Sequence, residues 1–296
     1  MAQNEIIEVL DGREWHFTLA AAAAARATLA LEAGKVLFFP QLAFGLEPGE
    51  QRFLTPACSD GKAKNISYDS RGAVLQGTSL TGKDRAQLAA LIARFALHAR
   101  ALIESLLPAY SPQLQPALTS YRPLQVERRG LSARKDDSRL HMDAFASRPN
   151  QGKRILRVFT NLNPHGEARV WDIGEPFERF APRYVPHISM PLPGSAWLLR
   201  QLHITKGRRS PYDHVMLQLH DRVKLDHHYQ QSADKLRFHF PPGSTWVVYS
   251  DRVLHAALSG QYLLEQTFYL PASAMQDENL SPLRILERLY QRELAA

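Results

Sequence analysis

The chain has 296 residues, of which 45% are hydrophobic, and this is enough for one large domain or two small ones with a well-filled core. Its single cysteine, Cys58, excludes a disulfide framework and a cysteine-rich zinc site and fits a reducing compartment. The formal net charge of +7 is typical either of a soluble protein with a basic surface or of a protein with an acidic partner, such as an anionic lipid or an acidic sugar. Against a nucleic-acid partner, the sequence shows no zinc finger, aromatic RNA-binding motif or recognition-helix pattern.

The first 120 residues are expected to form a largely helical support. An Ala-rich stretch predicts a helix over residues 18–33. The apolar run 36–39 then predicts a buried strand that a proline ends. A second long helix is predicted over 84–107, because apolar residues recur there at helical spacing. No apolar run approaches the roughly 20 residues that a membrane span needs.

From about residue 121 onward the pattern changes to short apolar or alternating runs separated by Pro and Gly turns. Several short strands with little helix between them indicate a barrel or a sandwich. The predicted strands are 154–163, 195–199, 215–219, 236–240, 245–249 and 262–270.

The C-terminal stretch 281–296 is predicted to contain a helix. One side of it carries leucines, and Arg284, Arg288 and Arg292 recur every four residues on another side. The helix either packs on the barrel through its apolar side or contacts an anionic membrane surface through its arginines.

The most informative feature of the sequence is the tripeptide His141-Met142-Asp143. Residues i and i+2 of a strand point to the same side, so His141 and Asp143 can bind one ion while Met142 points away. His255 follows the predicted strand 245–249 and is expected to supply a third ligand. Two imidazoles and one carboxylate form a facial triad, which holds Fe(II) and leaves other coordination positions open for substrate and O₂.

Other histidines compete for the role of the third ligand, since the chain has twelve. His220, at the end of the predicted strand 215–219, is the main alternative. His239 and the adjacent pair His227 and His228 are expected to be structural or exposed. The ligand types favour iron over zinc, because a His-x-Asp pair with a distal histidine and open positions is the oxygenase arrangement.

The order of these elements predicts a mainly β fold with flanking helices, whose core is a double-stranded β-helix of the jelly-roll or cupin-like type. We expect a single domain over 1–296, in which 121–272 form the barrel after the helical support and before the C-terminal helix. In such a barrel the His-x-Asp pair and the distal histidine line the open mouth.

Longer stretches of the chain resemble the Fe(II)/2-oxoglutarate/O₂-dependent dioxygenases and, within them, the Kdo 3-hydroxylases of Gram-negative bacteria. The similarity extends over nearly the whole chain and is more specific than the triad alone. The matching stretches are 31–40, 59–67, 134–141, 154–165, 212–221 and 241–271.

The resemblance implies that Fe(II), 2-oxoglutarate and O₂ are used to hydroxylate C3 of the Kdo sugar in the lipopolysaccharide inner core, on a Kdo-lipid A glycolipid, to give Ko. It also implies a cytoplasmic protein, peripheral on the inner membrane. A basic protein suits this substrate, because Kdo carries a carboxylate and lipid A carries phosphates. The candidate anion contacts are Lys62, Lys64, Lys135, Arg139, Lys206, Arg208 and Arg209.

The distal carboxylate of 2-oxoglutarate needs a buried cation, because an unpaired buried charge is costly. Many relatives place an Arg or Lys about ten residues after the distal histidine, but this chain has Glu265-Gln266-Thr267 there. We expect Arg157 to serve instead, on the predicted strand 154–163, unless it is a salt-bridge partner of Glu265. Asn161 shares its face of the strand, and Gln266 or Thr267 is expected to add a hydrogen bond.

Two other functions remain as alternatives. One is a 2-oxoglutarate oxygenase that acts on another glycolipid or on a protein side chain. The other is a non-enzymatic, cupin-like module that binds a sugar or a lipid. The sequence does not determine the oligomeric state.

Overall fold

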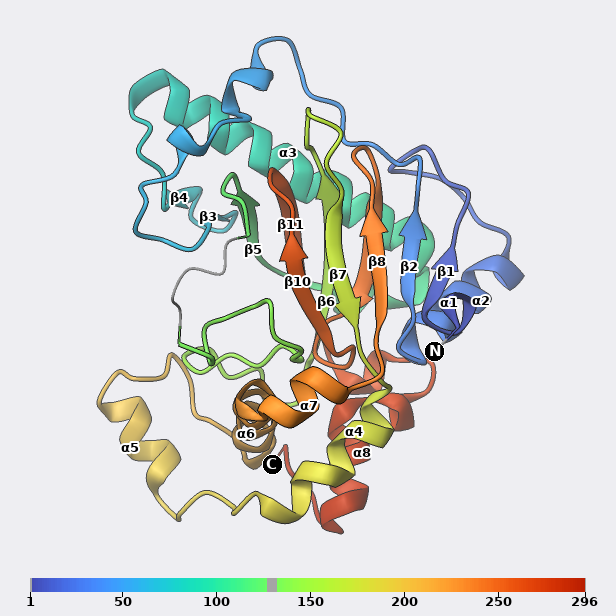
Figure 1. Ribbon diagram of the computed structural model, residues 1–296, viewed down its shortest axis with the longest axis vertical. Helices are drawn as coiled ribbons and strands as arrows, with labels where there is room; N and C mark the ends of the chain where they lie inside the picture. The colour runs from blue at the N-terminus through green and yellow to red at the C-terminus, as the bar shows by residue number, and fades with distance from the viewer. Residues whose placement is uncertain (1, 127–131, 296) are drawn as a thin grey trace.

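The computed structural model describes residues 2–126 and 132–295, and two β-sheets that face each other form its centre (Figure 1). The larger sheet has the order β1 (Ile7–Val9), β2 (Val36–Phe39), β9 (Thr245–Tyr249), β6 (Arg154–Asn161), β11 (Leu263–Leu270), β5 (Gln115–Arg122), β3 (Ile66–Asp69) and β4 (Val74–Gln76). The smaller sheet has the order β10 (His255–Ser259), β7 (Arg169–Ile173) and β8 (Leu236–Phe240). Apart from the parallel pair β1–β2, the strand pairs are antiparallel.

The segment that carries the His-x-Asp pair extends the smaller sheet. His141 forms an isolated antiparallel bridge with His255, in which each backbone N–H donates to the other residue's carbonyl. The smaller sheet, extended by the segment around His141, therefore has the order His141 segment, β10, β7, β8. It faces the strands β5, β11, β6 and β9 of the larger sheet. This is the arrangement of a double-stranded β-helix, and the predicted fold class is confirmed.

Aromatic side chains fill the space between the two sheets. The rings of Phe240 and Trp246 stack with centroids 4.0 Å apart, and Phe159 stacks on the other side of Trp246 at 5.3 Å. Trp171 meets Phe159 edge-on at 5.1 Å. These residues come from strands of both sheets, so the interior of the barrel is closely packed below the metal-binding residues.

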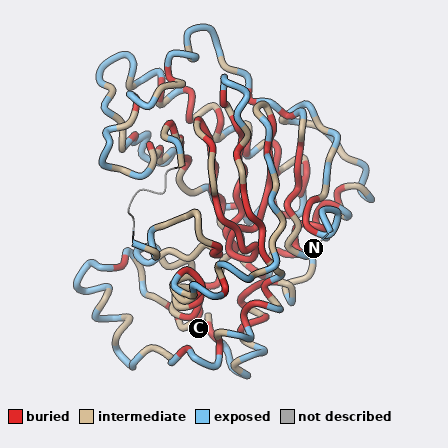
Figure 2. The backbone as a smooth tube through the Cα atoms, in the orientation of Figure 1, coloured by how far each residue is buried: buried red, intermediate tan, exposed pale blue. Residues whose placement is uncertain are grey.

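Two helices support the outer face of the larger sheet, α2 (Ala21–Glu32) and α3 (Gly82–Leu106). By length and composition α3 could span a membrane. Its apolar stripe from Leu88 to Leu106 is nevertheless buried in the core beside Leu156 and Val158 of β6, as expected for the core helix of a globular fold (Figure 2). A short helix, α1 (Gln3–Ile6), precedes β1.

A second group of helices lies at the end of the barrel where β7 and β10 meet the His-x-Asp segment (Figure 1). It consists of α4 (Phe177–Tyr184), α6 (Pro211–Leu225), α7 (His227–Ser232) and α8 (Pro282–Tyr290). The helix α5 (Ser195–Gln201) stands apart from them at the edge of the molecule. Short 3-10 helices occupy Glu50–Phe53, Pro56–Cys58, Pro108–Gln113, Val185–His187, Ala272–Ala274 and Glu278–Leu280.

Two predicted strands are wrong. Residues 195–199 lie in α5, and residues 215–219 lie in α6. The buried residues of α6 include Tyr212, Val215 and Leu219, which follow helical spacing, and Ser210 caps the helix through a reciprocal capping box with Asp213. A short apolar run does not distinguish a strand from one face of a helix, and here the capping box decides.

The other predicted elements are present: the strands 36–39, 236–240 and 245–249 have the predicted bounds, and the remaining elements have shifted ends. The first helix starts at Ala21, and the C-terminal helix ends at Tyr290 because Gln291 adopts a left-handed conformation with φ 51°. The strands β1, β3, β4, β5, β7 and β10 were not predicted, because each is short or carries several polar residues.

Candidate metal centre

The structure brings His141, Asp143 and His255 together as one buried cluster. Their potential ligand atoms all lie within 4.8 Å of one another. The Nδ1 atom of each histidine lies 2.8 Å from a backbone carbonyl oxygen, that of Arg139 for His141 and that of Val253 for His255. Because a carbonyl only accepts, Nδ1 must carry the proton, and this leaves Nε2 of both rings free to bind a metal.

The protonation states of the three residues also suit a divalent cation. Burial lowers the pKa of both imidazoles, and the neighbouring His255 lowers that of His141 further, so both rings are neutral. Burial opposes ionisation of Asp143, but the Arg157 guanidinium outweighs it and holds the pKa of this carboxyl well below the usual range. Two neutral imidazoles and one carboxylate are a donor set for Fe(II).

Neighbouring residues fix the orientation of the cluster. The backbone N–H of Asp143 donates to the carbonyl of Ser250 at 2.7 Å. The Trp171 ring stacks on His255 with centroids 4.9 Å apart and planes inclined by 24°. His220, the alternative third ligand, lies on α6 with its ring edge-on to His141 at 5.4 Å, outside the ligand cluster. The other candidates His227, His228 and His239 are exposed.

A chain of buried charges leads from the cluster into the barrel. Arg157 Nη1 lies 2.9 Å from Asp143 Oδ2 and 3.4 Å from Glu265 Oε1, and Glu265 also pairs with Arg122. Arg157 therefore faces the metal-binding residues, and it also has the salt-bridge partner that the sequence offered as an alternative. The salt bridge to Glu265 is therefore present, and the contact of Arg157 with 2-oxoglutarate stays a prediction.

A second buried guanidinium, that of Arg169, was missed in the sequence. Only 3% of Arg169 is exposed, and burial together with the nearby Arg122 lowers its pKa to about 9. Its Nη1 donates to the carbonyl of Gly260 at 3.0 Å, whereas Nε has no hydrogen-bond partner. Within the described ranges no carboxylate forms an ion pair with it, so Arg169 is a buried cation without a direct ion-pair partner.

The other predicted co-substrate residues are already hydrogen-bonded within the protein. The side chain of Asn161 donates to the carbonyls of Glu167 and Phe240. Gln266 accepts from Thr119 Oγ1 at 2.5 Å, and it alternates with Glu265 and Thr267, so it points away from Arg157. Thr267 lies opposite Arg157 in the sheet and donates to Glu265 Oε1 at 3.3 Å.

Three of the seven predicted anion contacts have partners near the His-x-Asp segment. Lys64 pairs with Asp137, whose other carboxylate oxygen lies 3.3 Å from the Nζ of the buried Lys224. Arg139 Nε lies 3.6 Å from Asp136. Arg209 donates to the carbonyl of Ala146, just after Asp143. The remaining four residues are exposed on the surface: Lys62, Lys135, Lys206 and Arg208.

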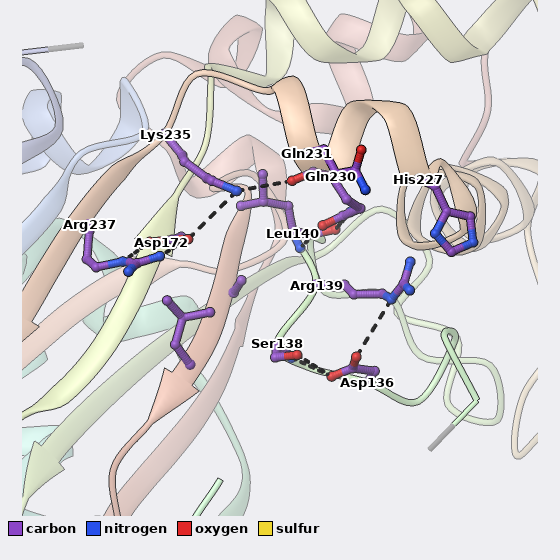
Figure 3. A pocket seen from close by; sticks show the side chains of 12 residues that line it. Asp136, Ser138, Arg139, Leu140, Asp172, His227, Gln230, Gln231, Lys235 and Arg237 are labelled. Atoms are coloured by element: carbon purple, nitrogen blue, oxygen red, sulfur yellow. Dashed lines mark hydrogen bonds and ion pairs between the residues drawn. The ribbon is translucent and has the colours of Figure 1, made fainter. Parts of the chain in front are cut away.

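A cavity of about 390 Å³ lies on the outer face of the smaller sheet, not at the triad (Figure 3). Leu140 and Ala256 line it, and each alternates with a metal-binding histidine, so the sheet separates this cavity from the metal centre. Asp172 pairs there with Arg237 and Lys235, as Figure 3 shows. Arg139 also lines this cavity, and this places it away from the predicted substrate side.

Comparison with known proteins identifies the family. The family model of 3-deoxy-D-manno-oct-2-ulosonic acid (Kdo) hydroxylase matches residues 14–293. The solved structure of the Kdo hydroxylase KdoO in complex with α-ketoglutarate and Fe(III) is 45% identical, with 98% of this chain and 97% of that chain covered and a TM-score of 0.94. The complex of KdoO with cobalt(II) is 46% identical, with the same coverage and a TM-score of 0.95. A search of curated proteins gives no match.

Proposed function

Because the chain belongs to the Kdo hydroxylase family, we propose that it hydroxylates C3 of the Kdo sugar on a Kdo-lipid A glycolipid to give Ko. It is an Fe(II)- and 2-oxoglutarate-dependent dioxygenase. The observation that carries the proposal is the buried cluster of His141, Asp143 and His255, with both Nε2 atoms free. The resemblance of long stretches in the sequence supports the same activity.

Iron bound at this cluster supplies the activation of O₂, coupled to oxidative decarboxylation of 2-oxoglutarate to succinate and CO₂. The protein's own residues bind the iron, orient its ligands and shield the site from water. His141, Asp143 and His255 provide the ligand atoms. Arg157 keeps Asp143 ionised and in place through their 2.9 Å ion pair. The aromatic packing around Trp171 excludes water from the far side of His255.

Two buried guanidinium groups are candidates for the distal carboxylate of 2-oxoglutarate. Arg157 lies next to the metal-binding residues but already pairs with Asp143 and Glu265. Arg169 has no ion-pair partner among the described residues and lies four residues from Ile173, the partner of His255 in the sheet. Four residues span roughly 13 Å along a strand, a gap that the co-substrate and a long arginine side chain can bridge together.

The positive charge near the metal centre supports a glycolipid as the substrate. Lys64 contacts Asp137, four residues before His141, and Arg209 contacts the carbonyl of Ala146, three residues after Asp143, so cations touch the chain before and after the metal-binding pair. Such cations suit the Kdo carboxylate and the lipid A phosphates. We also propose that the enzyme acts as a peripheral protein at the cytoplasmic face of the inner membrane.

The test is a panel of acceptors given to the iron-loaded enzyme with 2-oxoglutarate and O₂, with succinate as the readout. We expect succinate formation above the acceptor-free rate with Kdo-lipid A, and none with lipid A that lacks Kdo or with the Asp143→Ala variant. Stimulation only by another glycolipid or by a peptide would assign a different oxygenase substrate. Bound iron without any succinate would favour a cupin-like binding module.

A further inference from the structure

The segment between α4 and α6 exposes an unusual amount of apolar surface. Five large hydrophobic residues between positions 192 and 204 are more than half exposed: Leu192, Trp197, Leu198, Leu202 and Ile204. The other exposed large hydrophobics of the described chain are scattered singly over distant elements. Single exposed residues are normal, whereas a contiguous group of this kind marks an interaction surface.

Three of these side chains lie on α5 or at its end. Leu198 and Leu202, four residues apart, share one side of the helix, Trp197 neighbours Leu198, and Arg200 points to another side. No residue of α5 is buried, and the helix stands at the edge of the molecule (Figures 1 and 2). The apolar face is therefore not used for packing within the described protein.

Basic residues border this apolar face. Arg200 lies within α5, and Lys206, Arg208 and Arg209 follow within nine residues, while residues 191–209 contain no acidic side chain. An apolar face with a tryptophan, bordered by arginine and lysine, is the composition of a helix that lies in the interface of an anionic bilayer. A protein partner with a neutral apolar groove would give no reason for the basic border.

The segment is hydrogen-bonded to the loop that follows the metal-binding residue Asp143. The backbone N–H of Lys206 donates to the carbonyl of Ser147 at 2.8 Å, and the Arg209 side chain donates to that of Ala146 at 2.6 Å. Ala146 and Ser147 follow Asp143 by three and four residues. A membrane contact at α5 would therefore hold the mouth of the metal site close to the lipid surface.

The C-terminal helix is a weaker candidate for this role. Arg284 of α8 is paired with Glu278 and Glu287, and Arg288 donates to the carbonyl of Asn279. The apolar side of the same helix, with Leu283 and Leu286, is buried against the barrel end. The helix therefore packs on the barrel through its apolar side, which is the first of the two interpretations that the sequence allowed.

We infer that residues 191–209 form the membrane-docking element of this protein, with Trp197, Leu198 and Leu202 inserted into the interface of an anionic phospholipid bilayer. The inference rests on the proposed function, because it names the surface through which the enzyme reaches a membrane-embedded glycolipid. Docking by this element brings the Asp143 loop to the headgroup layer, where the sugar of such a glycolipid lies.

The experiment measures binding to lipid vesicles by sedimentation, for the full chain and for two triple variants. The first is Trp197→Ser/Leu198→Ser/Leu202→Ser. The matched control is Val74→Ser/Leu97→Ser/Leu225→Ser, which removes exposed hydrophobics elsewhere. On vesicles of phosphatidylglycerol and phosphatidylethanolamine we expect the α5 variant to bind at least about tenfold more weakly, and the control to bind like the wild type. Vesicles of phosphatidylcholine alone should bind the wild type weakly.

A blue shift of tryptophan fluorescence on vesicle addition, absent in the α5 variant, would be the matching spectroscopic signature. Equal vesicle binding by the wild type and the α5 variant would overturn the inference, as would no binding by the wild type. Self-association that the α5 variant abolishes, without vesicle binding, would assign the surface to a second copy of the chain instead.

Turnover separates this inference from the proposed function. If docking fails but the function holds, the ratio of succinate formed on vesicle-embedded Kdo-lipid A to that formed on the same lipid in detergent micelles is equal in wild type and α5 variant. If the function fails, neither form of the glycolipid stimulates succinate formation by the wild type. We expect the ratio to fall at least about tenfold in the α5 variant.

Discussion

The Nη1 atom of Arg157 lies 2.9 Å from Oδ2 of Asp143, so a buried cation on the larger sheet touches a metal-binding carboxylate on the opposite side of the barrel. The same guanidinium reaches Glu265 at 3.4 Å. Arg157 thus connects the metal-binding Asp143 to the buried carboxylate of Glu265. Arg169 makes neither contact, so the two arginines have different roles.

The first prediction separates the roles of Arg157 and Arg169. Arg169→Gln should raise the KM for 2-oxoglutarate by at least about tenfold with little change in metal affinity, because its guanidinium has no ion-pair partner among the described residues and is available for the co-substrate carboxylate. Arg157→Gln should weaken metal binding as well, because Asp143 loses its ion-pair partner. Steady-state kinetics and Co(II) titration of both variants make the comparison. An unchanged KM in Arg169→Gln would leave Arg157 as the carboxylate-binding cation.

The second prediction concerns the triad. His141→Ala and Asp143→Ala should each lower the affinity for Co(II) by at least about 100-fold and abolish turnover, because each removes a ligand atom from a cluster of three. His220→Gln is the matched control, since its ring touches His141 but lies outside the cluster. We expect this variant to retain Co(II) binding. Full activity in either alanine variant would refute the triad.

The third prediction concerns stability. Arg154 and Asp251 are fully buried and form two hydrogen bonds at 2.8 and 3.2 Å, with the Arg154 guanidinium also over the ring of Tyr249. Arg154→Met should lower the free energy of unfolding by about 3–5 kcal/mol, because it leaves the Asp251 charge uncompensated. Urea unfolding measures the loss. The double variant Arg154→Met/Asp251→Asn should recover part of it, and a purely additive loss would argue against this coupling.

The fourth prediction is a dependence of stability on pH through Glu265. Burial disfavours its ionised form, but Arg122 and then Arg157 hold its pKa below the usual value of 4.5. The folded state therefore binds fewer protons here than the unfolded state. The stability that this carboxylate contributes is fully present above about pH 4.5 and is lost as the pH falls through the lower, folded-state pKa.

Glu265→Gln should accordingly be less stable than the wild type at neutral pH and lose less stability on acidification below about pH 4.5. Urea unfolding at a series of pH values measures both differences. Glu293→Gln, at an exposed position, is the control and should follow the wild type. The same pH slope in Glu265→Gln and wild type would show that Glu265 contributes no such linkage.

The sequence was sufficient for the metal centre because its signal is local. His141 and Asp143 share a side through strand alternation alone, and His255 follows a strongly apolar strand, β9. Local periodicity in the sequence also predicted several elements correctly: the long helices α2 and α3 and the strands β6, β8, β9 and β11.

The features that were missed depend on tertiary contacts. Arg169 lies in a stretch with acidic and basic neighbours, and only the pairing of β7 with β8 and β10 buries it. Residues 215–219 form an apolar run that suits a strand or a helix, and the cap at Ser210 decides between them. The exposure of α5 could not be anticipated, because its apolar residues read as a core strand in the sequence.

The most direct test of the account is turnover of Kdo-lipid A under isotopically labelled O₂, with mass spectrometry of the glycolipid and of succinate. The account predicts one labelled oxygen atom on the Kdo sugar and one in succinate, in equal amounts, with neither formed by the Asp143→Ala variant. Labelled succinate with an unmodified glycolipid would contradict the assignment of Kdo as the hydroxylated group. Hydroxylated Kdo that carries no label would contradict the oxygenase chemistry itself.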